Sequence, residues 1–352
     1  MTDSTNIIKK NKSRIFELDI LRGLAALTVA LFHISLDIPK EYITFSPSIF
    51  SIGSPMPSLF FIISGFVIFM TIEKIKDWKE FVLTRFFRLY PSFWISIFLS
   101  LIFVYFLGNG NMPSSKVLFA NITMIPDFFR QPLIVGSYWT LYIEIEFYII
   151  ILIAYCLKLI PRINATILFL LLVDYILHFS RYYNEHIFIV TIGLIPFLSQ
   201  AHFFIAGIIF YQLKMYPERR KDYKLYVLLL LCLLFTFIMH GHGGKVFYFF
   251  NLWQEFSINS VFFFIFLLFA FDIPFLPNSK TLKLFGIISY NFYLLHDLIG
   301  GIIMNKLCKN SLPPVFALGL TILLIGCMSY WICFYIEHPI MRFSKKAFRK
   351  EL

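Results

Sequence analysis

The chain has 352 residues, of which 59% are hydrophobic and only 14% are charged. So little charge cannot cover a water-soluble domain of this size, which excludes a soluble enzyme and predicts an all-α, polytopic membrane protein. The Lys and Arg residues behind the formal net charge of +11 lie mostly in the expected loops, and they form no basic stripe in a soluble domain. This placement predicts contact with membrane lipid and excludes a nucleic-acid partner.

Apolar runs predict about ten transmembrane helices. They divide the chain into a tail at 1–17, a transmembrane domain at 18–336 and a second tail at 337–352. Within 181–213, Pro196 could separate a short outer helix from a true span. The ten expected spans are 18–36, 57–72, 91–107, 138–158, 163–180, 197–213, 224–240, 257–272, 287–305 and 315–336.

The positive-inside rule predicts the orientation of these spans. With a cytoplasmic N-terminus, the inner segments hold 23 of the Lys and Arg residues and the outer segments hold seven, while Arg22 lies within a span. This asymmetry favours ten spans with both termini in the cytoplasm.

The first span contains two ionisable residues, Arg22 and His33. Eleven positions at 100° each return to nearly the same helix face, and the two residues are roughly 16 Å apart along the axis. Ionisable residues inside a span are expensive and indicate a functional site. His33 is expected near the outer surface.

Two further segments carry polar residues beside this span. The second span has Ser64 and Gly65 at its middle, which favours close packing between helices. Arg85 and Arg88 follow in a basic cytoplasmic segment. If this segment is helical, the two residues share one side and could bind a phosphorylated anion. The competing interpretation is ordinary positive-inside charge beside lipid headgroups.

The fourth span opens with Trp139 and contains two carboxylates, Glu144 and Glu146. Being two positions apart, they point about 200° away from each other, so only one can face a given pocket. Glu144 shares a face with Thr140 and Tyr148 at a depth comparable to His33, so a His–Glu pair is one interpretation. A structural buried hydrogen bond is the other.

The ninth and tenth spans supply the last candidates. Ser289, Tyr293 and His296 follow i, i+4, i+7 spacing and predict a polar stripe on one continuous helix. That stripe either lines a cavity or forms an interhelical hydrogen-bond seam. Glu337 is expected at the cytoplasmic surface, where it could steady Arg85 or Arg88.

Together, these segments resemble the membrane acyltransferase 3 family, which decorates bacterial cell-surface glycans. The resemblance covers nearly the whole chain. The family usually has Ser where Thr140 stands and often has an acidic residue where Ile145 stands, whereas here the extra acid is Glu146. The matching segments are RG…H (Arg22, Gly23, His33), FFIISGF (Phe60 to Phe66), RFFRLYP (Arg85, Arg88, Pro91), WTLYIEIEFY (Trp139, Thr140, Leu141, Glu144, Phe147, Tyr148), SYNFYLLH (Ser289, Tyr290, Tyr293, His296) and EHP (Glu337, Pro339).

The resemblance implies an O-acyltransferase of the bacterial cytoplasmic membrane. It would move an acyl group, usually acetyl, from cytoplasmic acyl-CoA to a hydroxyl of a surface carbohydrate or its lipid-linked precursor. His33 is expected to act as general base with Glu144 orienting it, and Arg85, Arg88 and Glu337 are expected at the donor. No metal is expected, because no close metal-ligand spacing occurs. The other pocket residues are Arg22, Ser64, Trp139, Thr140, Tyr148, Ser289, Tyr293 and His296.

A proton-coupled transporter is the alternative, with His33, Glu144 and His296 as a relay. The sequence has no inverted half-repeats with matching broken helices, which favours the enzyme. The acceptor and the oligomeric state do not follow from the sequence.

Overall fold

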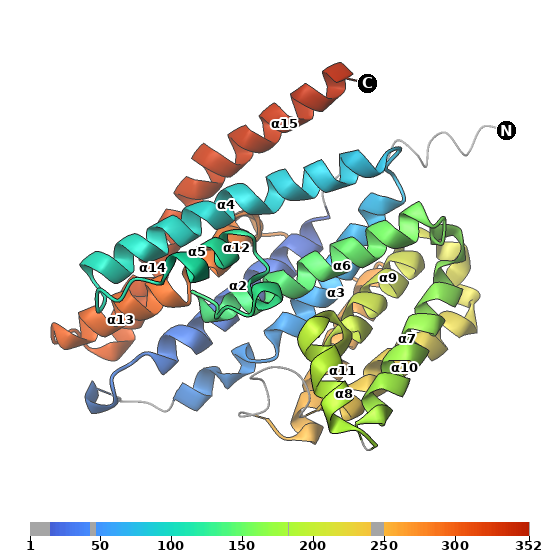
Figure 1. Cartoon of the computed structure of the whole chain (residues 1–352), viewed down its shortest axis with the longest axis horizontal. Coiled ribbons are helices and arrows are strands. Elements are labelled where there is room, and N and C mark those ends of the chain that lie inside the picture. The colour runs from blue at the N-terminus through green and yellow to red at the C-terminus, as the bar shows by residue number, and fades with distance from the viewer. Residues whose placement is uncertain (1–14, 43–46, 182, 241–249, 352) are drawn as a thin grey trace.

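The computed structural model describes residues 15–42, 47–181, 183–240 and 250–351. This part of the chain is 82% helix and contains no strand, which confirms the predicted all-α class. Most of the long helices run obliquely side by side in one bundle, and α15 projects from one end (Figure 1). The α-helices are α2 (Phe16–Leu36), α3 (Met56–Ile72), α4 (Trp78–Phe106), α5 (Ser115–Ile122), α6 (Trp139–Cys156), α7 (Ile163–Ser180), α8 (Glu185–Leu194), α9 (Ala201–Met215), α10 (Tyr223–Met239), α11 (Leu252–Ala270), α12 (Lys280–Leu295), α13 (Leu298–Lys309), α14 (Pro314–Ile332) and α15 (His338–Glu351).

Seven helical segments among the described residues are long and apolar enough to cross a membrane. An eighth is a broken span made of α12 and α13, and α9 and α10 are shorter apolar helices. Every expected span therefore coincides with a helix, while the count of ten and the side of the termini stay predictions. The seven segments are Phe16–Leu36, Ile49–Ile72, Trp78–Phe106, Gly136–Cys156, Ile160–Ser180, Leu252–Ala270 and Pro314–Ser344.

Two close helix crossings form the centre of the bundle. α3 packs along α9, where a Cβ on Gly65 would lie 2.0 Å from the Phe204 carbonyl oxygen and a Cβ on Gly207 would lie 2.1 Å from that of Ile62. α2 packs along α12 in the same way, because a Cβ on Gly286 would lie 2.2 Å from the Asp19 carbonyl oxygen. Small residues let helix backbones approach within a membrane.

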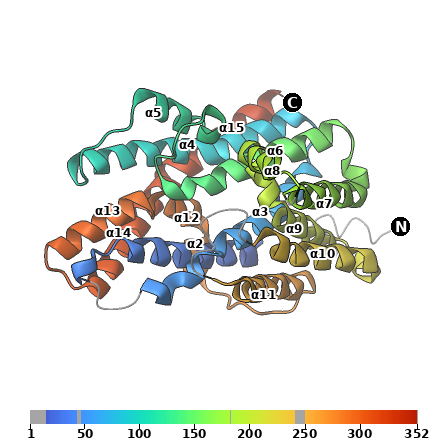
Figure 2. The same ribbon diagram turned by 60° about the horizontal axis from the view of Figure 1, so that its bottom comes forward.

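The remaining helices surround this centre. Figure 2 shows α4 and α5 at one face of the bundle and α11 at the opposite face, with α2 and α3 between them. The short helix α8 ends before the 3₁₀ turn η7 (Pro196–Ser199), and α9 follows that turn. The sequence interpretation of Pro196 as a divider of this region is therefore correct.

Two expected boundaries are wrong. The third span was expected to begin at 91, but α4 begins at Trp78, where the Asp77 side chain accepts a hydrogen bond from the Lys79 N–H, and it continues through Pro91. Membrane helices tolerate such a proline because neighbouring groups satisfy the freed backbone. The ninth span was expected to be one helix, but α12 and α13 meet at a bend of 76° beside His296 and Asp297.

Candidate active site

A pocket of about 140 Å³, lined by both charged and apolar side chains, lies among α2, α3, α4, α6 and α12. Pockets that enclose a whole drug-sized ligand typically measure roughly 300–1,000 Å³, so this one admits only a slender part of a larger molecule. Nine of the residues expected from sequence line it: Arg22, Ser64, Arg85, Arg88, Thr140, Glu144, Tyr148, Ser289 and Tyr293.

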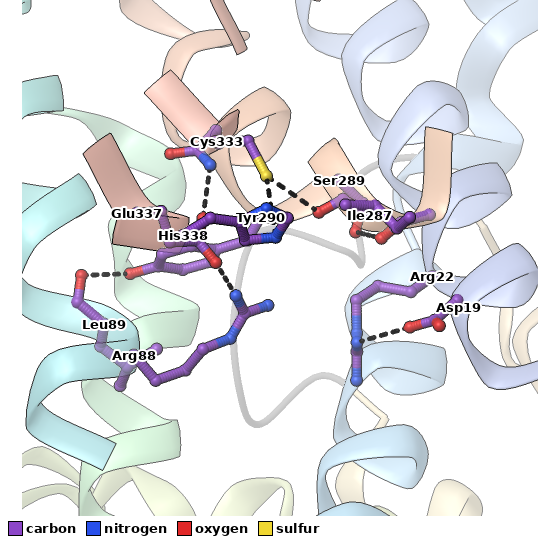
Figure 3. A network of polar contacts seen from close by, with 12 residues as sticks. Asp19, Arg22, Arg88, Leu89, Ile287, Ser289, Tyr290, Cys333, Glu337 and His338 are labelled. Atoms are coloured by element: carbon purple, nitrogen blue, oxygen red, sulfur yellow. Dashed lines mark hydrogen bonds and ion pairs between the residues drawn. The ribbon is translucent and has the colours of Figure 1, made fainter. Parts of the chain in front are cut away.

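Three guanidinium groups line this pocket, and two of them have acidic partners. Arg22 lies 3.6 Å from the Asp19 carboxylate, and Arg88 forms an ion pair with Glu337. Figure 3 shows Arg22 and Arg88 on opposing helices, with Glu337 beside Arg88. The Glu337 carboxylate is 1% exposed and also accepts a hydrogen bond of 2.6 Å from the Asn291 amide. A buried carboxylate needs partners of this kind.

Arg85 is the third guanidinium of the pocket, and its charge is not neutralised by a carboxylate among the described residues. Its Nη2 donates to the Thr71 hydroxyl at 2.5 Å, and its buried Nε has no hydrogen-bond partner. A buried donor without a partner is costly and points to a missing acceptor. A planar guanidinium suits a phosphate in this role.

Glu144 lines the pocket and is hydrogen-bonded to two hydroxyl groups. Its Oε1 accepts from Ser64 at 2.9 Å and from Tyr148 at 2.6 Å. The neighbouring Glu146 points elsewhere and accepts from the backbone N–H of Phe197 at 2.7 Å. The two carboxylates thus serve different sites, as their spacing predicts, and Glu146 supports the start of η7.

Tyr293 lines the pocket and also contacts residues outside it. Its hydroxyl lies 2.8 Å from the Thr140 hydroxyl and donates to the Ser137 carbonyl at 2.9 Å. Its ring packs edge-on against Phe60, another pocket residue, with centroids 5.4 Å apart. The His296 ring lies on Tyr293 as well, at 5.0 Å.

His33 is absent from the lining of the pocket and lies beyond Tyr293 and His296. Its ring meets that of His296 edge-on at 5.3 Å. The expected pair of His33 with Glu144 is not formed, because the carboxylate beside His33 belongs to Asp297. The His33 Nδ1 and the Asp297 Oδ1 are 3.7 Å apart.

Asp297 is the residue that the sequence interpretation missed. An acidic residue in an apolar stretch is itself a signal of a site, and Asp297 directly follows His296. On one continuous helix it would share the face of the Ser289, Tyr293 and His296 stripe, because it lies four positions after Tyr293. In the structure it lies at the bend between α12 and α13, with its carboxylate facing His33 of α2.

The remaining expected residues have structural contacts. Trp139 packs against Phe61 with ring centroids 6.0 Å apart, outside the pocket lining. Ser289 lines the pocket but donates its hydroxyl proton to the Gly286 carbonyl at 2.8 Å. Within the part of the chain that the structure describes, no three His, Cys, Asp or Glu side chains come together as a metal site requires.

A membrane-embedded helical bundle around a pocket lined by arginines defines this protein as an integral membrane protein with a site among its helices. A family model described as an acyltransferase domain matches residues 15–338, nearly the whole chain. The chain belongs to the acyltransferase 3 family and is a membrane acyltransferase. No curated protein and no solved structure matches it significantly.

Proposed function

We propose that this protein is an acyl-CoA-dependent O-acyltransferase that transfers an acetyl group to a hydroxyl of a cell-surface carbohydrate or its lipid-linked precursor. The observation that carries the proposal is the order of groups along the bundle. Arg85 lies beside Tyr148, whose hydroxyl donates to Glu144 one turn earlier on α6. A further turn toward the start of α6, Thr140 contacts Tyr293, and the His296 ring lies between Tyr293 and His33. A phosphate-bearing donor and a hydroxyl acceptor would therefore meet between Arg85 and His33.

The donor end would hold the phosphates of acyl-CoA. Arg85 offers a charge without a carboxylate partner, and Arg88 offers a second guanidinium whose position is fixed by Glu337. The pocket is too small for a whole CoA molecule, so its nucleotide would stay outside at the cytoplasmic surface. The pantetheine arm would enter the pocket past Glu144 and Ser64.

The acceptor end would place a hydroxyl beside His33. The neutral imidazole removes the hydroxyl proton while the oxygen attacks the thioester carbonyl carbon. The carbon–sulfur bond then breaks, and the CoA thiolate takes the proton back from the imidazolium. Base catalysis of this kind contributes roughly 10²–10⁴-fold.

Tyr293 would have to move for the thioester to reach His33. It lines the pocket, contacts the His296 ring that meets His33, and is held by the Thr140 hydroxyl and the Ser137 carbonyl. Two hydrogen bonds contribute about 1–3 kcal/mol together, which substrate binding can offset. Water is thereby kept from the thioester until the acceptor arrives.

A transfer assay with purified protein tests the proposal. Radiolabelled acetyl-CoA is mixed with a hydroxyl acceptor, and labelled ester is counted per folded molecule in wild type and in His33→Gln. We expect ester only with the wild type, because an amide can hydrogen-bond but cannot accept the proton. Equal turnover by His33→Gln would remove His33 as the base. A protein that moves protons across vesicles but leaves acetyl-CoA intact would be a transporter, which the family membership does not support.

A further inference from the structure

The carboxylate of Asp297 is held in one orientation by the backbone of another helix. Its Oδ2 accepts a hydrogen bond of 2.7 Å from the Ser137 N–H. A backbone N–H can only donate, so this oxygen must remain an acceptor. Gly136 keeps the approach open, since a Cβ there would lie 3.3 Å from the same oxygen.

The second oxygen of this carboxylate faces His33. Its Oδ1 lies 3.7 Å from the His33 Nδ1. This separation exceeds a hydrogen bond, but contacts in active sites are often long before substrate binds and tighten afterwards. The side chains of His33 and Asp297 are 32% and 19% exposed, so both are partly shielded from bulk water.

Other charged and titratable groups surround His33 without replacing Asp297. His296, from the α12–α13 bend, presents a ring edge, and its Nδ1 is engaged with the Tyr293 carbonyl. Asp37, one residue past the end of α2, interacts electrostatically with both His33 and Asp297. Among the described residues, only Asp297 brings a carboxylate oxygen within 4 Å of a ring nitrogen of His33.

We propose that Asp297 is a positioning residue that keeps the proton of neutral His33 on Nδ1 and leaves the Nε2 lone pair free to act as base. This inference rests on the proposed role of His33. An acceptor facing Nδ1 selects the Nδ1–H form of the ring, and its negative charge also stabilises the imidazolium that forms during attack. Glu144 then does not orient His33, and it lines the pocket proposed for the donor.

Asparagine at this position would reverse the hydrogen-bond pattern. The Ser137 N–H would take the amide oxygen, which turns the NH₂ group toward His33. A donor facing Nδ1 requires a lone pair on that nitrogen, so the ring proton moves to Nε2. Nε2 can then no longer accept the proton of the acceptor hydroxyl. Asp297→Asn is nearly isosteric, so a packing role alone would leave activity almost unchanged.

The test compares Asp297→Asn with Asp297→Glu. Glutamate is bulkier but keeps the charge and both acceptors. We expect Asp297→Asn to lower kcat on the order of 10²–10⁴-fold, with acetyl-CoA affinity within twofold of wild type. Asp297→Glu should retain at least tenfold more activity than Asp297→Asn. A purely structural role gives the opposite order, with glutamate more damaging than asparagine, and would overturn the inference.

Controls separate this inference from the proposed function. Asp127→Asn, an exposed residue of the turn η4 (Pro126–Phe129), should behave as wild type. If His33→Gln is inactive while Asp297→Asn keeps kcat within threefold of wild type, the positioning role fails and the base assignment survives. If His33→Gln is active, the base assignment fails first. Should Asp297→Asn not fold, Asp297→Ser carries the same expected loss of kcat.

Discussion

The Glu337 carboxylate joins Arg88 of α4 to Asn291 of α12. Glu337 itself lies at the end of the π-helical turn η10 (Cys333–Glu337), between α14 and α15. The Asn291 amide therefore holds the buried acid that in turn orients Arg88 in the pocket. The Tyr290 ring adds to this arrangement, because its centroid lies 5.5 Å from the Arg88 guanidinium carbon.

Removing this acid should destabilise the bundle. Glu337→Ala leaves the Arg88 charge and the Asn291 amide without their partner, and breaking a buried pair costs about 3–5 kcal/mol. Glu337→Gln keeps an acceptor and should cost less than half as much. Thermal unfolding in detergent measures both variants. Equal midpoints for wild type and Glu337→Ala would show that the pair contributes nothing to stability.

Donor binding should depend on Arg85 and Arg88. Replacing both with Ala should weaken acyl-CoA binding by about 2–4 kcal/mol, because charged hydrogen bonds contribute about 1.5–3 kcal/mol each and water compensates in part. Lys at both positions should recover only part, since a point charge lacks the bidentate fork. Calorimetry with CoA is the measurement. Unchanged affinity in the double Ala variant would place the phosphates elsewhere.

Glu144 offers a contrast with Asp297. Its Oε1 accepts from two hydroxyls, and Gln keeps an oxygen for both. We therefore expect Glu144→Gln to reduce kcat by less than about tenfold, well below the 10²–10⁴-fold range expected for loss of base catalysis. Initial rates of Glu144→Gln and Asp297→Asn show which substitution lowers kcat more. A larger loss at Glu144 than at Asp297 would return the orienting role to Glu144.

The pH dependence of stability should depend on Asp272, which follows the membrane-spanning segment Leu252–Ala270 of the structure. A hydrogen bond from Lys214 lowers the pKa of Asp272 against partial desolvation, and Arg220 adds to the effect. Because the folded pKa is below the unfolded value of 3.8, the stabilisation is present above that value and is lost as the pH falls through the folded pKa. For such exposed pairs it amounts to about 0.2–1 kcal/mol.

Asp272→Asn should thus lower the unfolding midpoint slightly at pH 7, and the gap to wild type should close at a pH below the folded pKa of Asp272. Lys224→Gln is a suitable control, because this exposed lysine forms no ion pair among the described residues. A gap of the same size at both pH values would show that the carboxylate charge is not its origin.

The orientation in the membrane can be tested with reporter fusions. The asymmetry of Lys and Arg predicts that a reporter at 110–116 lies outside and one at 217–222 lies inside. The reverse result at either site would contradict the ten-span topology. It would also move His33 to the cytoplasmic side, where a surface carbohydrate could not reach it.

Much of the fold follows from the sequence because the membrane restricts the choices. A spanning segment must satisfy its own backbone hydrogen bonds, so long apolar runs predict helices directly. The close packing at Gly65 follows from the same reasoning, since two helices can approach only where side chains are small. The extension of α4 through Pro91 was not predictable, because local sequence does not show which neighbours satisfy the freed carbonyl.

Several residues that line the pocket were also predicted from the sequence. Arg22, Arg85 and Glu144 are ionisable residues within or beside apolar helices, and each lines the pocket. The sequence did not show which side chains these residues contact. A helix period gives the face on which Glu144 lies, but it does not show which neighbouring helix supplies its partner.

Tertiary structure alone decided the surroundings of His33. The sequence determined that an ionisable His33 lies in a membrane helix and that Asp297 lies in another. The 76° bend between α12 and α13 brings them to 3.7 Å, and the Ser137 N–H fixes the carboxylate there. A bend of this kind depends on contacts among α2, α12, α13 and the turn before α6, which no local pattern contains. Helical periodicity places Asp297 on the face of Tyr293, but it does not show which residue of another helix that face meets.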